Sequence, residues 1–423
     1  MKTILQKHPL PFLIALLFLS SCTCNPADGG GKIKAKPIEN RLSQAIVLGA
    51  DYLLKDITEE GAFVYRINMN PEIRLKRKYN WLRHAGTIYS LATYVDWSGN
   101  KKPLPKIEQT AKYLIETALA PLAEEPELQA IWSLERYTGK KAPPTAKLGG
   151  SGIALVALLS LEKVSPGFNN RQQLEALGKF IQFMQKSDGG FYSKYIPSKV
   201  GRDDSWTSLY YPGEAALGLV MLYEYTKDQS FLASALDALG YLARLREGRA
   251  RVEPDHWALL ATQRVMLHFN KLKEPTTSRG LLLNHAAQVA KSIMRGQVKN
   301  VDGTIPTGAF DRNARTTPVA TRLEGLLAAY SFFPETHMSV RKAIAETAHP
   351  SIQLLLDSQV QDGTFKGAMP RSYFGNPANS SEPPDRRSTE VRIDYNQHFI
   401  SALMQYSELF YPKVQKVIKQ FTN

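Results

Sequence analysis

Carboxylate and imidazole side chains recur in this 423-residue sequence where long apolar segments begin. The pair Asp255-His256 precedes one such segment, and Asp394 and His398 stand at the start of another. Carboxylates and imidazoles exchange protons near neutral pH when their surroundings tune their pKa values, so a group of them is typical of general acid–base catalysis. Six residues of this kind are the candidate catalytic residues: His84, Glu214, Asp255, His256, Asp394 and His398.

Aromatic and guanidinium side chains lie close to these residues in the sequence. Flat aromatic rings match the C–H faces of sugar rings, and arginine binds acidic substituents through paired hydrogen bonds. The candidate substrate-binding residues are Trp81, Arg83, Trp206, Tyr210, Tyr211, Trp257, Arg322 and Tyr395. A sugar-binding site is one interpretation of this pattern, and aromatic packing within loops is the other.

Helix ends offer a purely structural interpretation for two of the acids. Asp255 is placed as an N-cap, and Glu214 follows Pro212 in a first helical turn, where the helix dipole favours negative charge. Asp394 and His398 have the i, i+4 spacing of residues on one helix face, so the two side chains can touch. The sequence shows no third ligand beside them, and we predict neither a metal ion nor another cofactor.

The elements that position these residues form a repeat. Lys179–Phe191 ends an amphipathic helix in Gln185 and an Asp-Gly-Gly turn, and a related pattern returns in Ile352–Phe365. Similar helix ends recur about every 60 residues, a spacing that suits two helices and their loops. They are anchored at Tyr52, Tyr113, Phe180, Tyr241, Ile293 and Gln353.

A second and more apolar set of segments lies between these helices. It comprises His84–Trp97, Gly149–Lys163, Pro212–Thr226, Asp255–Phe269, Pro318–Phe333 and Tyr395–Leu409. Twelve alternating helices predict six hairpins, and six hairpins can close into a ring that buries the apolar set. The predicted fold is thus all-α, an (α/α)6 toroid with an inner and an outer ring of helices. Parallel inner helices would gather their polar starts at one mouth.

Two further segments bear on that mouth. Gly149, Gly150 and Gly152 let a neighbouring backbone or a ligand come close. We expect no strand before them, so they do not match a phosphate loop. The long segment Gly367–Val391 is rich in Pro, Asn, Ser and Arg and lacks periodicity, and we expect it to fold over the mouth as a lid.

The N-terminal residues carry a targeting signal. Leu10–Leu19 is apolar, follows a basic start and is too short to span a bilayer comfortably. It ends in Leu-Ser-Ser-Cys at Leu19–Cys22, which resembles the lipobox of bacterial lipoproteins. The resemblance implies cleavage before Cys22, a lipid on its sulfur and, because Thr23 and not Asp follows, attachment to the outer membrane of the cell envelope. An ordinary signal peptide is the alternative.

The chain is therefore predicted to comprise a signal peptide over residues 1–21, a flexible tether over residues 22–40 and one toroid over residues 41–423. Its two cysteines, Cys22 and Cys24, both lie in the tether. The toroid consequently has no disulfide, no thiolate nucleophile and no cysteine-ligated zinc. We expect it to be a monomer.

The formal net charge is +14 at pH 7. A basic surface raises the rate of encounter with anionic partners, which in an envelope protein are acidic glycans, lipopolysaccharide or the membrane surface. Ordinary solvated faces are the alternative explanation. The export signal argues against nucleic acid as a partner.

Six hairpins with polar mouths resemble the six-hairpin (α/α)6 toroid superfamily over roughly residues 41–420. This resemblance implies a glycoside hydrolase, a polysaccharide lyase or a sugar epimerase. Similar toroids with cysteine-ligated zinc, the protein prenyltransferases and lanthionine cyclases, are disfavoured. The repeat also resembles that of triterpene cyclases, but their aspartate-rich acid motif has only a poor counterpart at residues 202–205.

The leading hypothesis is a glycoside hydrolase, in which one carboxylic acid protonates the leaving oxygen and a carboxylate activates water or attacks. We expect Asp255 and Asp394 in these roles, with Glu214 as substitute, while Arg83 and Arg322 bind an acidic substituent of the sugar. In the alternative epimerase or lyase, a mouth histidine removes a proton from carbon. A non-catalytic, lipid-anchored glycan-binding protein is the third possibility.

Overall fold

The computed structural model of the protein describes residues 37–415 and Ile418, apart from residues 56, 77, 140, 200, 300–302, 381, 383 and 384. The predicted signal peptide, Cys22 and most of the predicted tether lie outside the described residues. The first helix begins at Ile38, shortly before the predicted start of the toroid. Within the described part of the chain, no helix has the length and apolar character needed to cross a membrane.

Six long helices form an inner ring. They are apolar around most of their circumference, which favours burial on all sides. In α5, for example, every residue from Leu148 to Glu162 is buried. The inner helices are α2 (Trp81–Ser98), α5 (Leu148–Val164), α7 (Tyr211–Thr226), α9 (His256–His268), α11 (Thr316–Phe332) and α13 (Ile393–Phe410). Each coincides with one predicted apolar segment to within a few residues.

Six amphipathic helices surround the inner ring, and each buries one stripe against it. They are α1 (Ile38–Lys55), α3 (Leu104–Ala118), α6 (Arg171–Phe183), α8 (Gln229–Arg246), α10 (Arg279–Arg295) and α12 (Met338–Ser358). All six predicted repeat anchors fall within these helices. Short helical turns join some of the long helices: α4 (Glu135–Thr138), η1 (Phe269–Lys271), η2 (Glu335–His337) and η3 (Tyr373–Gly375).

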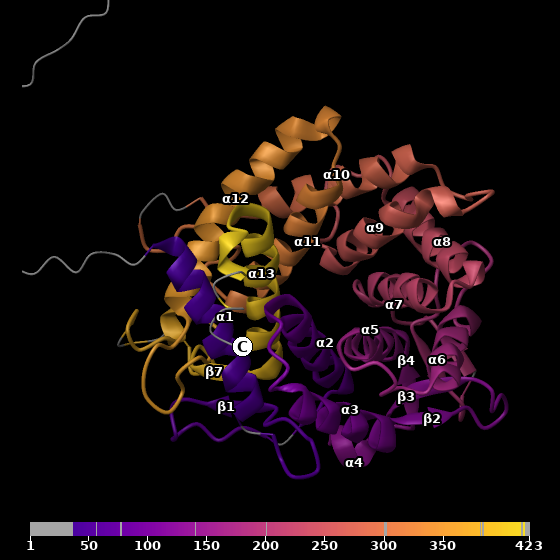
Figure 1. The fold of residues 1–423 in the computed structure, drawn as a ribbon, viewed down its shortest axis with the longest axis horizontal. Coiled ribbons are helices and arrows are strands. Elements are labelled where there is room, and N and C mark those ends of the chain that lie inside the picture. The colour runs from indigo at the N-terminus through magenta and orange to yellow at the C-terminus, as the bar shows by residue number, and fades with distance from the viewer. Residues whose placement is uncertain are drawn as a thin grey trace, which may run out of the picture. The chain divides into compact units, whose positions relative to one another are not determined.

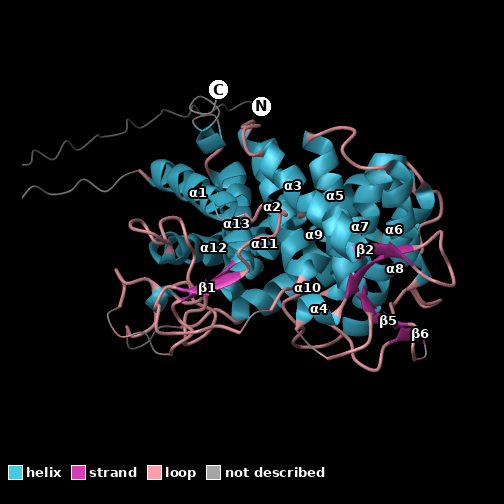
Figure 2. Ribbon diagram, turned by 90° about the horizontal axis from the view of Figure 1, so that it is seen from below, coloured by secondary structure: helices cyan, strands magenta, loops and turns pink. Residues whose placement is uncertain are grey.

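The inner ring is closed (Figure 1). Each inner helix packs on the next along the chain, and α13 packs on α2 to complete the circle. The first outer helix, α1, packs on the last inner helix, α13. Seen from the side, many of the connecting loops and short strands gather toward one end of the helices (Figure 2).

The glutamine that recurs in the predicted repeat links neighbouring hairpins. The side-chain amide of Gln185 donates to a backbone carbonyl of α8 at 2.9 Å. Gln297 does the same to α12 at 3.0 Å, and Gln359 to α1, also at 3.0 Å. The third of these bonds joins the last hairpin to the first. The turn after Gln185 contains Gly189 at φ +92°, a backbone region that favours glycine.

Short strands, which the sequence analysis did not predict, connect some of the helices. Five form an antiparallel sheet in the order β2 (Leu119–Pro121), β3 (Gln129–Ser133), β4 (Thr145–Lys147), β5 (Lys194–Ile196) and β6 (Gly201–Asp203). A separate pair joins β1 (Arg66–Asn68) to β7 (Glu390–Arg392). Strands this short show too little alternation to be read from sequence. Because β4 leads directly into α5, the expectation that no strand precedes the glycines was wrong.

Two of those glycines admit a neighbouring helix. A Cβ atom at Gly149 would lie 2.1 Å from Oε2 of Glu214, and one at Gly152 would lie 2.8 Å from the backbone nitrogen of Ala215. Both contacts are with α7, so small residues are needed for α5 and α7 to approach this closely. The close approach brings the starts of the two inner helices together.

Candidate functional site

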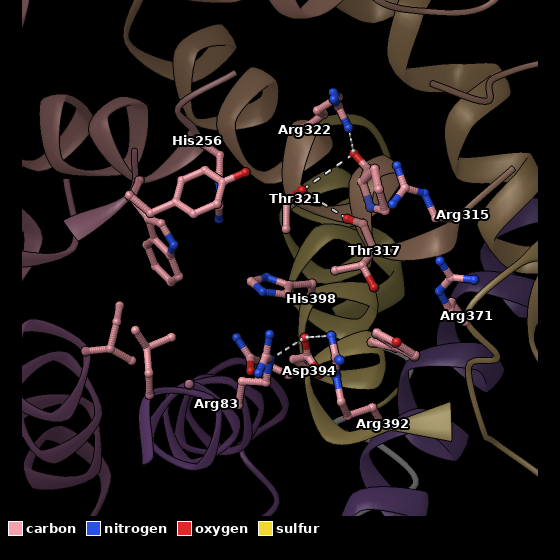
Figure 3. Close-up of a pocket in the computed structure, with 18 of the residues that line it drawn as sticks. Arg83, His256, Arg315, Thr317, Thr321, Arg322, Arg371, Arg392, Asp394 and His398 are labelled. Atoms are coloured by element: carbon pink, nitrogen blue, oxygen red, sulfur yellow. Dashed lines mark hydrogen bonds and ion pairs between the residues drawn. The ribbon is translucent and has the colours of Figure 1, made fainter. Parts of the chain in front are cut away.

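A cavity of about 500 Å³ opens where the inner helices begin (Figure 3). Its wall includes residues from the starts of α2, α7, α9, α11 and α13, and arginines from the segment 371–392. The polar starts of the inner helices thus meet at one cavity, as expected for a closed ring. Nine of the predicted site residues line it: Arg83, Tyr210, Glu214, His256, Trp257, Arg322, Asp394, Tyr395 and His398.

Two histidines come together in this cavity, with ring centroids 5.7 Å apart. Nδ1–H of His398 in α13 donates to Oε2 of Glu324 in α11 at 2.7 Å, which leaves Nε2 of His398 as the nitrogen available to a substrate. Both ring nitrogens of His256 are buried and have no hydrogen-bond partner among the described residues. An imidazole held without a partner in a polar cavity calls for a functional explanation.

The surroundings shift the two imidazole pKa values in opposite directions. Burial, with the added charges of His398 and Arg322, lowers the pKa of His256 well below its usual range. Burial acts in the same direction on His398, but the carboxylate of Glu324 outweighs it and raises the pKa of His398. Near neutral pH, His256 is therefore a neutral base and His398 the better proton donor, as expected for an acid–base pair.

Glu214 brings a buried carboxyl group to the wall of the cavity. Its Oε2 atom has no hydrogen-bond partner among the described residues. Burial and, to a lesser degree, repulsion from Asp255 raise the pKa of Glu214 well above its usual range, and Arg83 opposes the shift only in part. Glu214 thus keeps its proton to higher pH than an ordinary carboxyl group, as suits a group that donates a hydrogen bond or a proton.

Asp394 is held between two guanidinium groups. It accepts hydrogen bonds from Nε of Arg83 at 3.0 Å and from Nε of Arg392 at 2.5 Å. Burial acts to raise its pKa, but the two arginines outweigh burial and lower it. Asp394 is therefore a fixed negative charge. The expected contact between Asp394 and His398 is replaced by the bond from His398 to Glu324.

His256, Glu324 and His398 also form a group that could hold a metal ion, since their ligand atoms lie within 4.8 Å of one another. Two imidazoles and a carboxylate are a donor set that zinc and other transition metals accept. Sequence spacing pointed only to Asp394 with His398 as possible neighbouring ligands. An ion at this place would have to replace the hydrogen bond between His398 and Glu324.

Asp255 does not line the cavity, so its assignment as a catalytic carboxylate is corrected. It is fully buried beside the start of α9. Its Oδ1 accepts from the backbone N–H of Ala258 at 3.1 Å, and its Oδ2 accepts from Nη2 of Arg246 at 2.8 Å. Both oxygens serve the fold, one as a helix cap and the other in a buried ion pair. The N-cap interpretation of Asp255 is the one that the structure supports.

His84 and Trp81 are likewise absent from the cavity wall, and their assignments to the site are corrected. The Nε2–H group of His84 donates to the carbonyl of Thr110 in α3 at 2.9 Å, and its Nδ1 accepts from the hydroxyl of Tyr79 at 2.7 Å. Trp81 is 3% exposed and packs edge-on against His84 at 5.5 Å. Both residues therefore lie between the inner helix α2 and the outer helix α3, where their rings pack beside Tyr113 of α3.

The predicted aromatic residues separate into two groups. Three line the cavity: Tyr210, Trp257 and Tyr395. Tyr211 and Trp206 do not line it and pack edge-to-face on each other at 5.8 Å. Trp206 is 51% exposed, in the connection between β6 and α7. Trp206 therefore belongs to the connecting segment, and Tyr211 to the first turn of α7.

Several residues that line or support the cavity were not among the site residues predicted from the sequence. Glu324 lies beneath His398, and its signal in the sequence was a lone carboxylate inside an apolar segment, Leu323-Glu324-Gly325-Leu326. Four arginines of the wall were missed as well: Arg315, Arg371, Arg387 and Arg392. The segment Gly367–Val391 does reach the cavity, where it contributes arginines.

No protein-family model and no curated protein matches this sequence. Solved structures do match its fold. Cellobiose 2-epimerase from Bacillus thermoamylovorans has a TM-score of 0.63 at 9% identity, over 87% of this chain and 99% of that one. A GH76A α-1,6-mannanase of a Salegentibacter species has a TM-score of 0.57 at 12% identity, over 88% and 99%. A D-mannose isomerase has a TM-score of 0.58 at 10% identity, over 90% and 100%.

These structures match the fold of the chain, and the predicted (α/α)6 toroid is confirmed. At such low identity the likeness concerns the fold.

Proposed function

We propose that this protein is a sugar-active enzyme that moves a proton to and from the carbon beside a sugar carbonyl, as epimerases and isomerases do. The observation that carries the proposal is the pair His256 and His398, whose rings come together at 5.7 Å and whose pKa values are shifted apart. The structural likeness to sugar-acting enzymes supports a carbohydrate substrate, and the similar structures include a mannanase as well as an epimerase and an isomerase.

In the proposed reaction, neutral His256 takes the proton from carbon, and the electron pair moves onto the carbonyl oxygen to give an enediolate. His398, protonated through its pairing with Glu324, donates to that oxygen. The positively charged wall stabilises the negative charge that develops there. Return of the proton from His256 to the neighbouring carbon, while His398 takes a hydroxyl proton back, gives the isomer. For the epimer, His398 gives its proton to the opposite face of the same carbon instead of to the oxygen, and His256 keeps the proton that it took.

A glycoside hydrolase is the second candidate, and Glu214 is the observation that favours it. A buried carboxyl with a raised pKa on the cavity wall suits the acid that protonates a leaving oxygen. The second carboxylate would be Asp394, but two arginines hold it and lower its pKa, which makes it a weak base. With Asp255 outside the cavity wall, the histidine pair supports the proton-transfer enzyme better.

Deuterium exchange distinguishes the two reactions. Neutral sugars, uronic acids and sugar phosphates are incubated with the enzyme in deuterated water, and loss of the C–H signal beside the carbonyl is followed by proton NMR. We expect exchange with wild type and with His268→Asn, a change at the far end of the same helix, and none with His256→Asn. Hydrolysis without exchange, abolished by Glu214→Gln but kept in His256→Asn, would favour the hydrolase. No exchange into any sugar of the panel would contradict the proposal.

We also propose that Cys22 carries a lipid that anchors the enzyme in the cell envelope. The lipobox-like residues Leu19–Cys22 support it. Labelling with a clickable fatty acid in a bacterial host should mark wild type and leave Cys22→Ser unmarked. Equal labelling of the two proteins would contradict this location.

A further inference from the structure

The cavity carries an excess of positive charge. Six arginines line it among the described residues: Arg83, Arg315, Arg322, Arg371, Arg387 and Arg392. In the described part of the chain, these arginines form ion pairs with only four carboxylates: Asp311, Asp385, Glu390 and Asp394. Glu214 adds little negative charge because burial raises its pKa. This excess of positive charge over negative charge favours the binding of an anion in the cavity.

Three of these arginines, which we call the arginine triad (Arg315, Arg322 and Arg371), lie across the cavity from His256 (Figure 3). Arg322 forms no ion pair with a carboxylate in the described part of the chain. Its Nη1 donates to the carbonyl of Pro318 at 3.0 Å, and its guanidinium lies 5.1 Å from the centroid of Phe310. A partly buried guanidinium without a counter-ion is costly unless a ligand supplies the negative charge.

The rest of this wall also suits an anion. Thr317, at the start of α11, has an Oγ1 atom that is shielded from water and has no hydrogen-bond partner among the described residues. It lies beside the triad on the cavity wall (Figure 3). The start of α11 has no side-chain cap, so its backbone N–H groups add positive potential. A hydroxyl, three guanidiniums and a helix start are the groups that recognise oxyanions.

The triad is fixed before any ligand arrives. The backbone N–H of Thr316 donates to the carbonyl of Arg371 at 2.9 Å, and its hydroxyl donates to the carbonyl of Pro370 at 2.6 Å. A β-bridge pairs Arg315 with Ser372. These bonds tie the segment after residue 367 to the start of α11, so Arg315 and Arg371 are positioned by backbone contacts. A site fixed in this way binds with little loss of conformational freedom.

We propose that the arginine triad and Thr317 bind an anionic substituent of the sugar, a carboxylate, sulfate or phosphate, while the carbonyl end of the sugar meets His256 and His398. The position of the carbonyl end rests on the proposed function, whereas the anion site does not. Arg83 and Arg392 share Asp394, and Arg387 pairs with Glu390. Within the triad, Arg315 pairs with Asp311 and Arg371 with Asp385, so Arg322 is the member that has no carboxylate partner among the described residues. The substrate class is therefore a charged monosaccharide or the charged end of a glycan.

Calorimetric binding tests the anion site without requiring activity. Glucose 6-phosphate, glucose 6-sulfate, glucuronate, glucose and inorganic phosphate are titrated into the full-length protein. We expect at least one charged sugar to bind about tenfold or more tightly than glucose, with an affinity that falls as salt rises. The charged sugar that binds best identifies the anion. Equal binding of glucose and every charged sugar would overturn the proposal, and so would tighter binding of free phosphate than of any charged sugar.

Variants assign the binding to the triad. Arg322→Gln should weaken binding of the charged sugar about tenfold or more. The matched control Arg312→Gln removes an exposed charge from the segment that precedes α11 and should leave the affinity unchanged. Arg315→Gln, at a more exposed position, keeps the test available if Arg322→Gln fails to fold. Wild type should bind the charged sugar even if no exchange is ever observed, so the anion site is tested separately from the proposed reaction. Unchanged binding in folded Arg322→Gln and Arg315→Gln would overturn the assignment.

Discussion

Nδ1 of His398 and Oε2 of Glu324 are 2.7 Å apart, and they join two neighbouring inner helices beside the cavity. This bond fixes the orientation of the imidazole, and the carboxylate raises the pKa of His398 against the effect of burial. His256, with no such partner, has its pKa lowered. The bond to Glu324 thus raises the pKa of one histidine, while burial and the charges of His398 and Arg322 lower that of the other. Removal of Glu324 gives the first prediction.

Replacing Glu324 by Gln should move the alkaline limb of the pH profile to lower pH. His398 acts as the protonated partner, and its protonated form is lost as pH rises through its pKa. Without the carboxylate that pKa falls, by about one pH unit or more. Deuterium exchange measured from pH 5 to 9 checks the shift. A variant that loses activity equally at every pH would assign Glu324 a purely structural role.

His84 should make stability depend on pH. Burial lowers the pKa of this residue to about 4 in the folded protein. Below pH 6.5 the unfolded chain takes up a proton that the folded protein refuses until about pH 4, so the free energy of unfolding falls as pH falls through this window. Between pH 7 and pH 4.5, His84 is expected to lower the free energy of unfolding by roughly 2–3 kcal/mol. Urea denaturation of wild type and His84→Gln at both pH values measures this loss of stability. An equal loss in the two proteins between pH 7 and pH 4.5 would contradict the prediction.

Asp255→Asn should affect stability more than catalysis. The change keeps a side chain that can cap α9 but leaves the guanidinium of Arg246 without its buried partner. Breaking such a pair costs about 3 kcal/mol or more, while kcat/KM of the folded variant should stay within about tenfold of wild type, since Asp255 does not line the cavity. Thermal unfolding and exchange kinetics are the measurements. A well-folded variant with exchange abolished would restore Asp255 as a catalytic residue.

Gly149→Ala should destabilise the protein and disturb Glu214. The added Cβ would lie 2.1 Å from Oε2 of Glu214 and 2.2 Å from the ring of Tyr211, so side chains must shift at a cost of about 1–3 kcal/mol. Gly150→Ala is the matched control, because a Cβ there meets nothing closer than 3.9 Å. Equal unfolding temperatures of the two variants would show that the site adapts without cost.

Chelation should leave proton transfer unchanged. The proposed chemistry uses two imidazoles and requires no metal ion, although His256, Glu324 and His398 could surround one. Exchange rates are compared before and after dialysis against EDTA, with metal analysis of the purified protein. Activity that disappears on dialysis and returns with added zinc would assign the three residues to a metal centre instead.

The sequence predicted the helical framework well because each hairpin repeats the same local signals. Apolar segments without a polar stripe predicted inner helices, and the turn after Gln185 predicted where a hairpin changes direction. The ring then followed from the number of hairpins. The short strands β1 and β7 had no such signal, since Arg66 and Arg392 pair only when the first and last hairpins meet.

The sequence predicted where the site lies but not which of its side chains contact one another. The polar starts of the inner helices indicated a shared mouth, and nine of the predicted residues line it. Which acid contacts which base depends on helix rotation, which sequence spacing does not determine. Asp394 therefore pairs with Arg83, from the other end of the chain, and His398 with Glu324. Arg371 reaches the cavity because its segment is tied to the start of α11, a contact with no trace in the local sequence.

The contact of α13 with both α1 and α2 has a consequence for synthesis of the protein. Helical arrays with free ends can lose a terminal unit and keep the remainder intact. A nascent chain of this protein that stops before residue 393 would leave the flanks of α2 and α11 uncovered together and would lack His398. Activity should therefore appear in one step, with completion of the last helix, and partial translation products should be recognised as unfolded.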